Sequence, residues 1–521
     1  MRQTKKITTM AAAVVVTVLG LTACEAADDE DTPAVDRTAA APQAPAAATI
    51  AWGACPELAQ GAPARDPRQK CGVLRVPLDY KHPDGPAIDI AVSRLSTGEA
   101  GAEGGTREPL LVNPGGPALP GLDTPSALAP TLPPEVLAKY DLIGFDPRGV
   151  ERSTPQTCGL GDVPNVALFP YPAADGSIAK NVEFARTTAQ KCASNANLKF
   201  FTTANTARDM DRIREALGAD RIAYWGQSYG TYLGAAYDML FPQRTDKMVL
   251  EGNVDPAKAW AGEVAGWGKG MSERFPDAAA VAAKQTGRTP AQVTKDYLAL
   301  AARLDAKPAT IPGTPMSLDG ALLRNLTYAM LLHNETLPVL PKVWQAAAHL
   351  ADGKLTDADT AVIKEVFPGT APTPGVPADN AATMFLALMC GDVAWPAGVD
   401  GVREAVEADR ARWPLTAGMP VNAWTCAFWP GKPLDAPIEV TDQGARNVMV
   451  LQNRRDNATP WDSGVGLRTE LGGRAVLVGV DNGGHYVYHA GSACADRATV
   501  AFLAGGTLPT GDVTCDDVTS G

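Results

Sequence analysis

The sequence is short of positive charge, of histidine and of long apolar runs. Its 521 residues hold 46 Lys and Arg against 58 Asp and Glu, which gives a formal net charge of -12. A chain of this charge has no basic surface of the kind that binds nucleic acid. Beyond the N-terminal segment, no window sustains the roughly 18 apolar residues that a membrane span needs. We therefore expect a soluble body and no nucleic-acid partner.

Motifs for metals, nucleotides and repeats are also missing. The sequence has no His-Glu-x-x-His, no Gly-x-x-x-x-Gly-Lys loop, no Cys-x-x-Cys and no His/Cys cluster. No internal repeat of fixed period is found. We expect neither a metal nor another cofactor, and a hydrophobic content of 45% is enough to bury a large core.

The first residues have the features of an export signal. A basic stretch is followed by an apolar run, Ile7–Leu21, that is too short for a confident span. The run ends in Leu21-Thr22-Ala23-Cys24, which resembles the bacterial lipobox, whose cysteine is lipidated and becomes the mature N-terminus. Residues 1–23 are therefore predicted to be a lipoprotein signal and Cys24 the lipidated residue. An ordinary cleaved signal is the alternative.

Residues 24–50 are acidic and then rich in Ala and Pro, which is the composition of a tether. If Cys24 carries lipid, eight of the nine cysteines remain, a parity that suits disulfides in an oxidising compartment. They fall as four neighbouring pairs along the chain. We predict the disulfides Cys55 to Cys71, Cys158 to Cys192, Cys390 to Cys426 and Cys494 to Cys515; free buried thiols are the alternative.

The folded part alternates short apolar runs with helical stretches. The runs predict eight strands, at Gly72–Val76, Ile88–Leu95, Pro109–Val112, Tyr140–Phe145, Ile222–Trp225, Lys247–Leu250, Asn447–Leu451 and Ala475–Val480. Between them Thr206–Leu217 has helical spacing and ends at a glycine. The alternation predicts an α/β fold with a mostly parallel sheet. Residues 256–437 interrupt this alternation and are predicted to form an inserted helical cap. The core is then formed by residues 51–255 and 438–521.

The fifth predicted strand leads into a Gly-x-Ser-x-Gly motif at Gly226-Gln227-Ser228-Tyr229-Gly230. A helical stretch, Thr231–Leu240, follows the motif. A serine at such a sharp turn has a strained backbone, and the two glycines let strand and helix approach without side-chain clashes. Ser228 is therefore predicted to be a nucleophile.

A nucleophilic serine needs a base, and only five histidines are present. His485 follows the last predicted strand through Asn482-Gly483-Gly484, where a chain order of serine, acid and histidine places the base. His489 is the competitor. The other histidines are expected to lie at the surface or to be buried with their hydrogen bonds satisfied, without a catalytic role. They are His82, His333 and His349.

The acid that orients the base should leave the preceding strand. Asp456 follows Val448–Leu451 in a loop, before Thr459-Pro460, which has the pattern of a helix N-cap with proline in the first turn. Asp462, inside that helix, is the lesser candidate. Serine, histidine and a carboxylate together predict acyl-transfer chemistry.

Negative charge that develops on the attacked carbonyl needs backbone donors. The run Leu110–Val112 is a strand that ends in Asn113-Pro114-Gly115-Gly116-Pro117, whose bare backbone can point an N–H at an oxyanion. We predict that the N–H groups of Gly116 and Tyr229 are the two donors; a simple tight turn is the alternative.

These motifs resemble those of the α/β-hydrolase fold, and within it the secreted bacterial tripeptidyl aminopeptidases, relatives of the prolyl iminopeptidases. The resemblance spans roughly Trp52 to Cys515 and also includes Gly144-Phe145-Asp146-Pro147-Arg148-Gly149, which we expect to order the loop beside the site. It departs from the family pattern at Ala118-Leu119-Pro120-Gly121. It implies an eight-stranded α/β-hydrolase with a cap.

The resemblance also implies a serine exopeptidase that releases short peptides, often tripeptides, from free N-termini. Such an enzyme needs acids to hold the substrate ammonium, and Glu251, Asp255 and Asp392 are the expected candidates. We expect a monomer held at the extracellular face of the membrane by lipid, with release from the membrane as an additional outcome. Two alternatives stay open: an esterase with the same triad, and a surface-binding lipoprotein without activity.

Overall fold

The computed structural model describes residues 49–58, 61–97, 107–161, 163, 165–314, 316–367 and 373–518. The expected signal, Cys24 and nearly all of the tether fall on residues 1–48 and lie outside the described part. Among the described residues, no helix is both long enough and apolar enough to cross a bilayer.

A nine-stranded sheet in the order β1-β2-β4-β3-β5-β6-β9-β10-β11 forms the centre of the molecule. The first two pairings, β1 with β2 and β2 with β4, are antiparallel, and the others are parallel. The strands are Lys70–Pro77 (β1), Ala87–Leu95 (β2), Glu108–Asn113 (β3), Tyr140–Phe145 (β4), Ile222–Gln227 (β5), Thr245–Glu251 (β6), Val448–Arg455 (β9), Ala475–Gly483 (β10) and Val513–Cys515 (β11).

All eight predicted strands are present, and the mostly parallel sheet is confirmed. The expected strand number is wrong by one, because β11 adds a ninth strand beside β10 at the edge of the sheet. This strand has only three residues and no apolar run, so hydrophobic patterning could not detect it.

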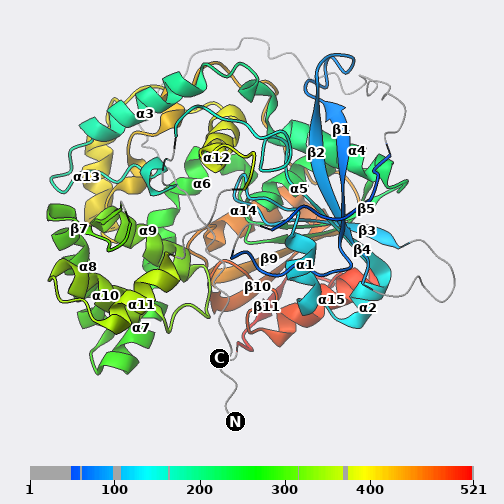
Figure 1. The fold of residues 1–521 in the computed structure, drawn as a ribbon. Coiled ribbons are helices and arrows are strands. Elements are labelled where there is room, and N and C mark those ends of the chain that lie inside the picture. The colour runs from blue at the N-terminus through cyan, green and yellow to red at the C-terminus, as the bar shows by residue number, and fades with distance from the viewer. Residues whose placement is uncertain are drawn as a thin grey trace, which may run out of the picture.

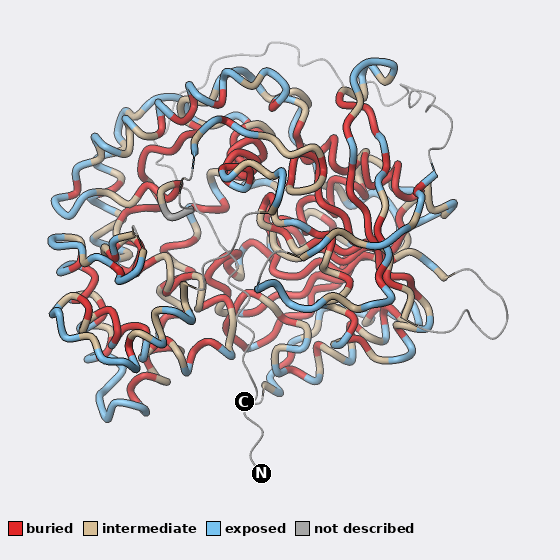
Figure 2. Tube along the Cα trace, in the orientation of Figure 1, coloured by how far each residue is buried: buried red, intermediate tan, exposed pale blue. Residues whose placement is uncertain are grey.

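Side chains of the central strands alternate between two apolar layers, one on each face of the sheet. Leu111 of β3 packs on one side, in the same layer as α4 (Thr203–Ala216), α5 (Tyr229–Leu240) and α14 (Trp461–Leu471). Leu110 and Val112 point the opposite way, toward α2 (Pro134–Lys139) and α15 (Ala493–Gly505). The central strands, such as β4 and β5, are buried nearly throughout (Figure 2). This rigid centre holds the strand ends that carry the site.

Helices inserted between β6 and β9 gather on one side of the sheet as a cap (Figure 1). The cap elements are η4 (Pro256–Lys258), α6 (Ala261–Ala265), α7 (Trp267–Thr286), α8 (Pro290–Ala306), β7 (Ala309–Thr310), β8 (Ser317–Leu318), α9 (Gly320–Leu331), α10 (Leu340–Ala351), α11 (Asp357–Val366), α12 (Asn380–Gly391), α13 (Val402–Arg412), η5 (Met419–Val421) and η6 (Thr425–Phe428). The expected helical insertion is therefore found, with one small hairpin, β7 and β8.

One part of the expected core also packs into the cap. Helix α3 (Ala179–Cys192) lies against η6, and the amide of Asn422 donates to the Pro170 carbonyl. The part of the β4–α4 segment that contains Pro170 and α3, which we expected in the core, thus packs with the cap. It includes η2 (Asn165–Leu168) and η3 (Leu198–Phe200), while α1 (Thr124–Leu128) and η1 (Ala129–Thr131) stay with the sheet.

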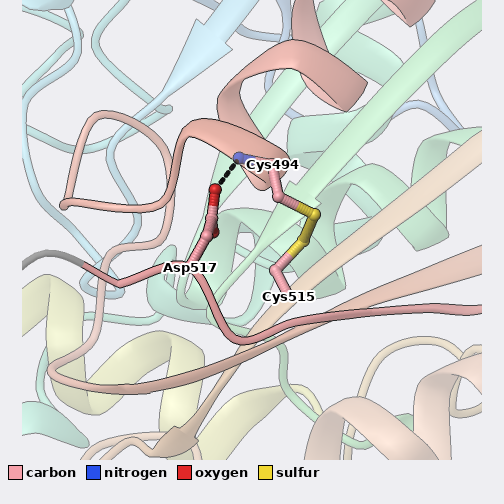
Figure 3. Close-up of side chains that lie close together, drawn as sticks. All are labelled: Cys494, Cys515 and Asp517. Atoms are coloured by element: carbon pink, nitrogen blue, oxygen red, sulfur yellow. Dashed lines mark hydrogen bonds between the residues drawn. A yellow bond between two sulfur atoms is a disulfide. The ribbon is translucent and has the colours of Figure 1, made fainter.

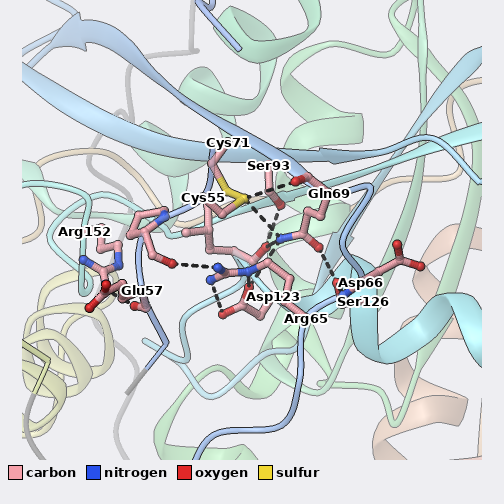
Figure 4. Close-up of a disulfide and its surroundings, with 12 residues drawn as sticks. Cys55, Glu57, Arg65, Asp66, Gln69, Cys71, Ser93, Asp123, Ser126 and Arg152 are labelled. Carbon is pink, nitrogen blue, oxygen red and sulfur yellow. Dashed lines mark hydrogen bonds and ion pairs between the residues drawn. A yellow bond between two sulfur atoms is a disulfide. The ribbon is translucent and has the colours of Figure 1, made fainter. Parts of the chain in front are cut away.

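The structure contains the four predicted disulfides. Cys55 to Cys71 fastens the segment before β1 to the sheet, next to an ion pair between Arg65 and Asp123 and a hydrogen bond from Gln69 to Leu122 (Figure 4). At the other end of the chain, Cys494 to Cys515 ties α15 to β11 (Figure 3).

Candidate active site

Ser228 occupies a sharp turn between β5 and α5. Its backbone has φ 57° and ψ -126°, a conformation rare for a residue with a side chain. Its N–H donates to the Glu251 carbonyl at 2.9 Å, so the turn is tied to β6. A Cβ at Gly226 would lie 2.3 Å from the Gly230 carbonyl, which explains the glycines of the motif. This is the strained strand-to-helix turn that the sequence predicts.

His485 and Asp456 form a buried pair at the same edge of the sheet. The histidine Nδ1 lies 2.8 Å from Asp456 Oδ2, and the two residues are 3% and 0% exposed. Asp456 also accepts from the N–H groups of Ala458 and Thr459 at 2.7 and 3.0 Å. Because a carboxylate only accepts, Nδ1 carries the proton and Nε2 is left as a base.

The imidazole reaches the neighbourhood of Ser228 across Gly252. This glycine follows Glu251, whose carbonyl holds the Ser228 N–H. A Cβ at Gly252 would lie 2.8 Å from Cε1 and 2.9 Å from Nδ1 of His485. Only a glycine leaves room for the ring beside the serine turn, so the three predicted triad residues converge on one edge of the sheet.

The competing candidates lie elsewhere. His489 is exposed in the loop before α15, and its N–H donates to Asp496 in the first turn of that helix. Asp462 is paired with Lys269 at the surface, with 59% of its side chain exposed. The helix after Asp456 begins at Trp461 with Pro460 as N-cap, one residue later than expected, because Thr459 turns its hydroxyl to Asp456 at 2.9 Å.

The glycine loop after β3 presses against the serine turn. A Cβ at Gly115 would lie 2.3 Å from the Gln227 carbonyl and 2.8 Å from the Ser228 Cβ. Asn113 Oδ1 accepts the Gly115 N–H at 3.0 Å. Within the described residues, the N–H of Gly116 finds no acceptor, and Tyr229 is the first residue of α5, where helical N–H groups lack partners. The loop shape thus allows the expected pair of oxyanion donors.

The Asp146 to Gly149 loop has a structural role, as expected. Arg148 makes two hydrogen bonds of 2.7 and 2.6 Å to Asp209, with both side chains 1% exposed. Asp146 accepts from the N–H groups of Leu122 and Arg152, and burial raises its pKa to about 7. Neither residue has a free group to offer a substrate.

Glu251 does not bind a substrate ammonium, which corrects the prediction. Its carboxylate accepts from Trp225 Nε1 at 3.1 Å and Gln227 Nε2 at 2.9 Å. It also accepts from the N–H groups of Val487 and Tyr488 at 2.6 and 2.7 Å. Four donors from the protein use both oxygens, so Glu251 instead fixes the loop that carries His485.

Asp255 is a second correction. It is 4% exposed, it is paired with Lys258 at 2.5 Å, and it accepts from the Ala257 N–H at 3.1 Å. A Cβ at Gly466 of α14 would lie 2.2 Å from its Oδ2, so the carboxylate is pressed under that helix. Asp255 therefore begins the cap and has no path to a substrate.

Asp392, the third predicted acid, is partly buried at the end of α12. Both of its oxygens are held by Thr203, through the backbone N–H at 2.8 Å and through the hydroxyl. Its hydrogen bonds therefore go to α4, and burial raises its pKa to about 7.

A group of cap residues lies beside His485 and has no signature in the sequence. The Leu332 carbonyl accepts the His485 N–H at 2.8 Å. The next residue, His333, stacks on Tyr486 with ring centres 5.0 Å apart, and Tyr486 lies 5.1 Å from the His485 ring. Glu335 completes the group through a 3.4 Å contact with His333, whose hydrogen bond holds the pKa of Glu335 below its usual value.

The described residues offer one geometrically possible metal site, and it does not fit a metal. Cys494, Cys515 and Asp517 lie within reach of a common ion, but the two sulfurs are joined as a disulfide (Figure 3). The Asp517 carboxylate instead accepts from the Cys494 N–H at 2.8 Å. A disulfide has no thiolate to offer, so this group stabilises the C-terminal segment.

Comparisons with known proteins agree with this fold. Residues 108–316 match the family described as alpha/beta hydrolase fold, and residues 415–515 match the one described as TAP-like protein. The serine protease Hip1 of Mycobacterium tuberculosis (strain ATCC 25618 / H37Rv) is 32% identical over 471 residues, covering 85% of this chain and 87% of that protein.

Two other relatives carry different names. The tripeptidyl aminopeptidase of Streptomyces coelicolor is 32% identical over 472 residues, covering 86% of this chain and 83% of that protein. The carboxylesterase B of Mycobacterium tuberculosis is 33% identical over 504 residues, covering 91% of this chain and 92% of that protein. Each likeness spans most of both chains.

Proposed function

The chain belongs to the α/β-hydrolase family of the TAP-like proteins and is a serine hydrolase, and from that premise we propose that it is an exported serine exopeptidase. Its substrates are peptides with free N-termini, from which it releases short peptides, tripeptides in the first instance. The observation that carries the proposal is the 2.8 Å contact between His485 and Asp456 beside the strained Ser228 turn.

The proposed reaction uses an acyl-enzyme. Ser228 Oγ attacks the scissile carbonyl while His485 Nε2 takes its proton, and Asp456 holds the imidazolium that forms. The N–H groups of Gly116 and Tyr229 bind the oxyanion. The C–N bond then breaks, and His485 returns the proton to the departing amine. A water, activated by the same histidine, hydrolyses the ester and frees Ser228.

Glu335 is the proposed partner of the substrate ammonium, in place of the corrected acids. It is exposed at the cap edge, two rings from His485 by way of His333 and Tyr486. Its lowered pKa keeps it anionic at neutral pH. Three extended residues span about 10 Å, so a tripeptide unit places its ammonium about that far from the scissile carbonyl. We propose that Glu335 meets the ammonium there.

Export and anchoring rest on the sequence. The basic and apolar start of the chain and the lipobox-like Leu21-Thr22-Ala23-Cys24 support a lipoprotein at the outer face of the membrane. The four disulfides support an oxidising compartment. We propose a monomer tethered by residues 24–50.

The test is hydrolysis of a tripeptide anilide by the mature protein, with a free N-terminus and then with an acetylated one. We expect cleavage of the free form alone, none by Ser228→Ala, and a KM raised about ten-fold in Glu335→Gln with kcat nearly kept, because the ammonium contact is made in ground and transition state alike. Glu365→Gln is the matched control, because Glu365 is also an exposed glutamate of the cap but lies in another helix, α11. Equal cleavage of both anilides would contradict the exopeptidase proposal.

A second candidate is an esterase with the same site, which the 33% identity to carboxylesterase B favours. Cleavage of a p-nitrophenyl ester, but of neither anilide, would select it. A binding lipoprotein without activity would cleave none of the three substrates.

A further inference from the structure

A buried chain of hydrogen bonds leads from the cap to the residue after Ser228. The Tyr229 hydroxyl lies 2.6 Å from Thr203 Oγ1, and that hydroxyl also contacts Asp392 Oδ2. The Thr203 N–H donates to Asp392 Oδ1 at 2.8 Å. Tyr229 and Thr203 are 2% and 1% exposed. Asp392, at the end of α12, thus reaches α5 through one threonine of α4.

Tyr229 occupies a sensitive position. It is the first residue of α5, and its backbone N–H is one of the proposed oxyanion donors. Its ring stacks on Trp260, with centres 5.6 Å apart, where the chain enters the cap. The ring is therefore held by the cap on one face and by Thr203 at its hydroxyl. A change in the hydrogen bonding of the Tyr229 hydroxyl therefore acts on the same residue whose backbone N–H is the proposed oxyanion donor.

The donor-to-acceptor direction of these hydrogen bonds depends on whether Asp392 carries a proton. The Thr203 hydroxyl has a single hydrogen, so it can donate to only one neighbour. With Asp392 ionised, Thr203 donates to the carboxylate and accepts from the Tyr229 hydroxyl. With Asp392 protonated, the acid donates to Thr203, and Thr203 then donates to Tyr229. The Tyr229 hydroxyl loses its acceptor in that state.

In the described part of the chain, the titratable groups that face Asp392 come from α5 and from the segment before β9. Tyr229 and Tyr232 approach it from α5, and Asp435 approaches from the segment before β9, where it is paired with Lys81 and Arg208. A small recess lined by Asp392, Asp435, Thr203 and Tyr232 connects this corner with solvent, which gives the proton a path. Burial, and to a smaller degree Asp435, raise the pKa of Asp392 to about 7.

We propose that Asp392 is a positioning residue that orients Tyr229 through Thr203, so that its ionised form favours the arrangement of the oxyanion hole that is productive. The proposal rests on the proposed site but not on the identity of the substrate. It gives Asp392 a role in turnover in place of the expected role in ammonium binding.

The test compares the pH profiles of kcat for wild type and Asp392→Asn. Asparagine keeps an acceptor for the Thr203 N–H and donates to its hydroxyl, so it imitates the protonated acid at every pH. We expect kcat of the variant to be about ten-fold below that of the wild type at about pH 9 and equal to it at about pH 5.5, with KM unchanged. The loss is smaller than for removal of an oxyanion donor, because the Tyr229 N–H is still present but points in a less favourable direction.

Further variants separate this role from a structural one. Thr203→Val breaks the chain, and Asp392→Asn should then cause no additional loss. Thr203→Ser keeps the hydroxyl and should restore the wild-type profile. Tyr232→Phe removes a hydroxyl from the same recess without touching the chain, and it serves as the control.

The proposal would be overturned if the ratio of the kcat of Asp392→Asn to that of the wild type did not change with pH. It would also be overturned if the losses of kcat in Thr203→Val and Asp392→Asn were fully additive in the double variant. The assay uses whichever of the anilide or the ester the wild type cleaves. Failure of the exopeptidase proposal would therefore appear in the wild type, and failure of this one only in the variants.

Discussion

The backbone N–H of Ser228 donates to the carbonyl of Glu251 at 2.9 Å, while the Glu251 carboxylate accepts the N–H groups of Val487 and Tyr488. One residue at the end of β6 therefore holds both the serine turn and the loop that carries His485. The relative placement of nucleophile and base depends on this residue.

Glu251→Gln should lower kcat by about ten-fold and destabilise the fold by about 2 kcal/mol. The glutamine amide brings hydrogens where four donors of the protein already converge, and buried hydrogen bonds to a charged acceptor are worth more than neutral ones. Thermal unfolding and steady-state kinetics on the same preparation check this. Wild-type values for both would mean that Glu251 does not fix the loop.

Gly115→Ala should lower kcat by about a hundred-fold or more, because the new Cβ would lie 2.3 Å from the Gln227 carbonyl and displace the loop of the oxyanion donors. Gly159→Ala is the control, because its φ is also positive, at +68°, and nothing lies within 4 Å of the added atom. Equal activity of the two variants would contradict the role given to the loop.

Glu263 makes stability depend on pH. It is 4% exposed and burial raises its pKa to about 8, so between about pH 4.5 and 8 the folded chain binds more protons here than the unfolded chain. The free energy of unfolding should fall as the pH rises through this window. Glu263→Gln has no proton to lose, and its melting temperature should fall less from pH 5 to about pH 9. Parallel curves for the two proteins would argue against the raised pKa.

The disulfide from Cys390 to Cys426 closes a loop with a sequence separation of 36 residues, at the end of the helix that carries Asp392. Replacing both cysteines by alanine should cost about 4 kcal/mol by the chain-entropy model. The shorter loop from Cys55 to Cys71, with a separation of 16, should cost about 3 kcal/mol. Melting temperatures of the two double variants measure this, and an unchanged value for Cys390 and Cys426 would contradict it.

Residues with a local signature could be predicted from the sequence. Ser228 sits in a motif, and His485 and Asp456 follow apolar strands, so chain order was enough to find them. Neighbouring cysteines likewise gave the disulfides. The acids could not be assigned in this way, because every carboxylate looks alike in a chain with 58 of them.

What separates those acids is their partners, which come from distant parts of the chain. The Glu251 carboxylate accepts hydrogen bonds from Val487 and Tyr488, and the Asp392 carboxylate accepts one from Thr203. Each donor lies about 190 residues or more away in the sequence. Glu335 becomes relevant only because a cap loop places His333 on Tyr486. Such contacts are created by tertiary packing and leave no periodic pattern in the sequence.

The central claim is that Ser228 is the nucleophile and is activated by His485. The most direct test is labelling of the mature protein with diisopropyl fluorophosphate, in which the serine oxygen bonds to phosphorus and fluoride leaves, followed by mass spectrometry of the peptides. We predict one adduct, on Ser228, and almost none in His485→Ala. Labelling of Ser228→Ala at the wild-type rate, or no adduct on the wild type, would contradict the account.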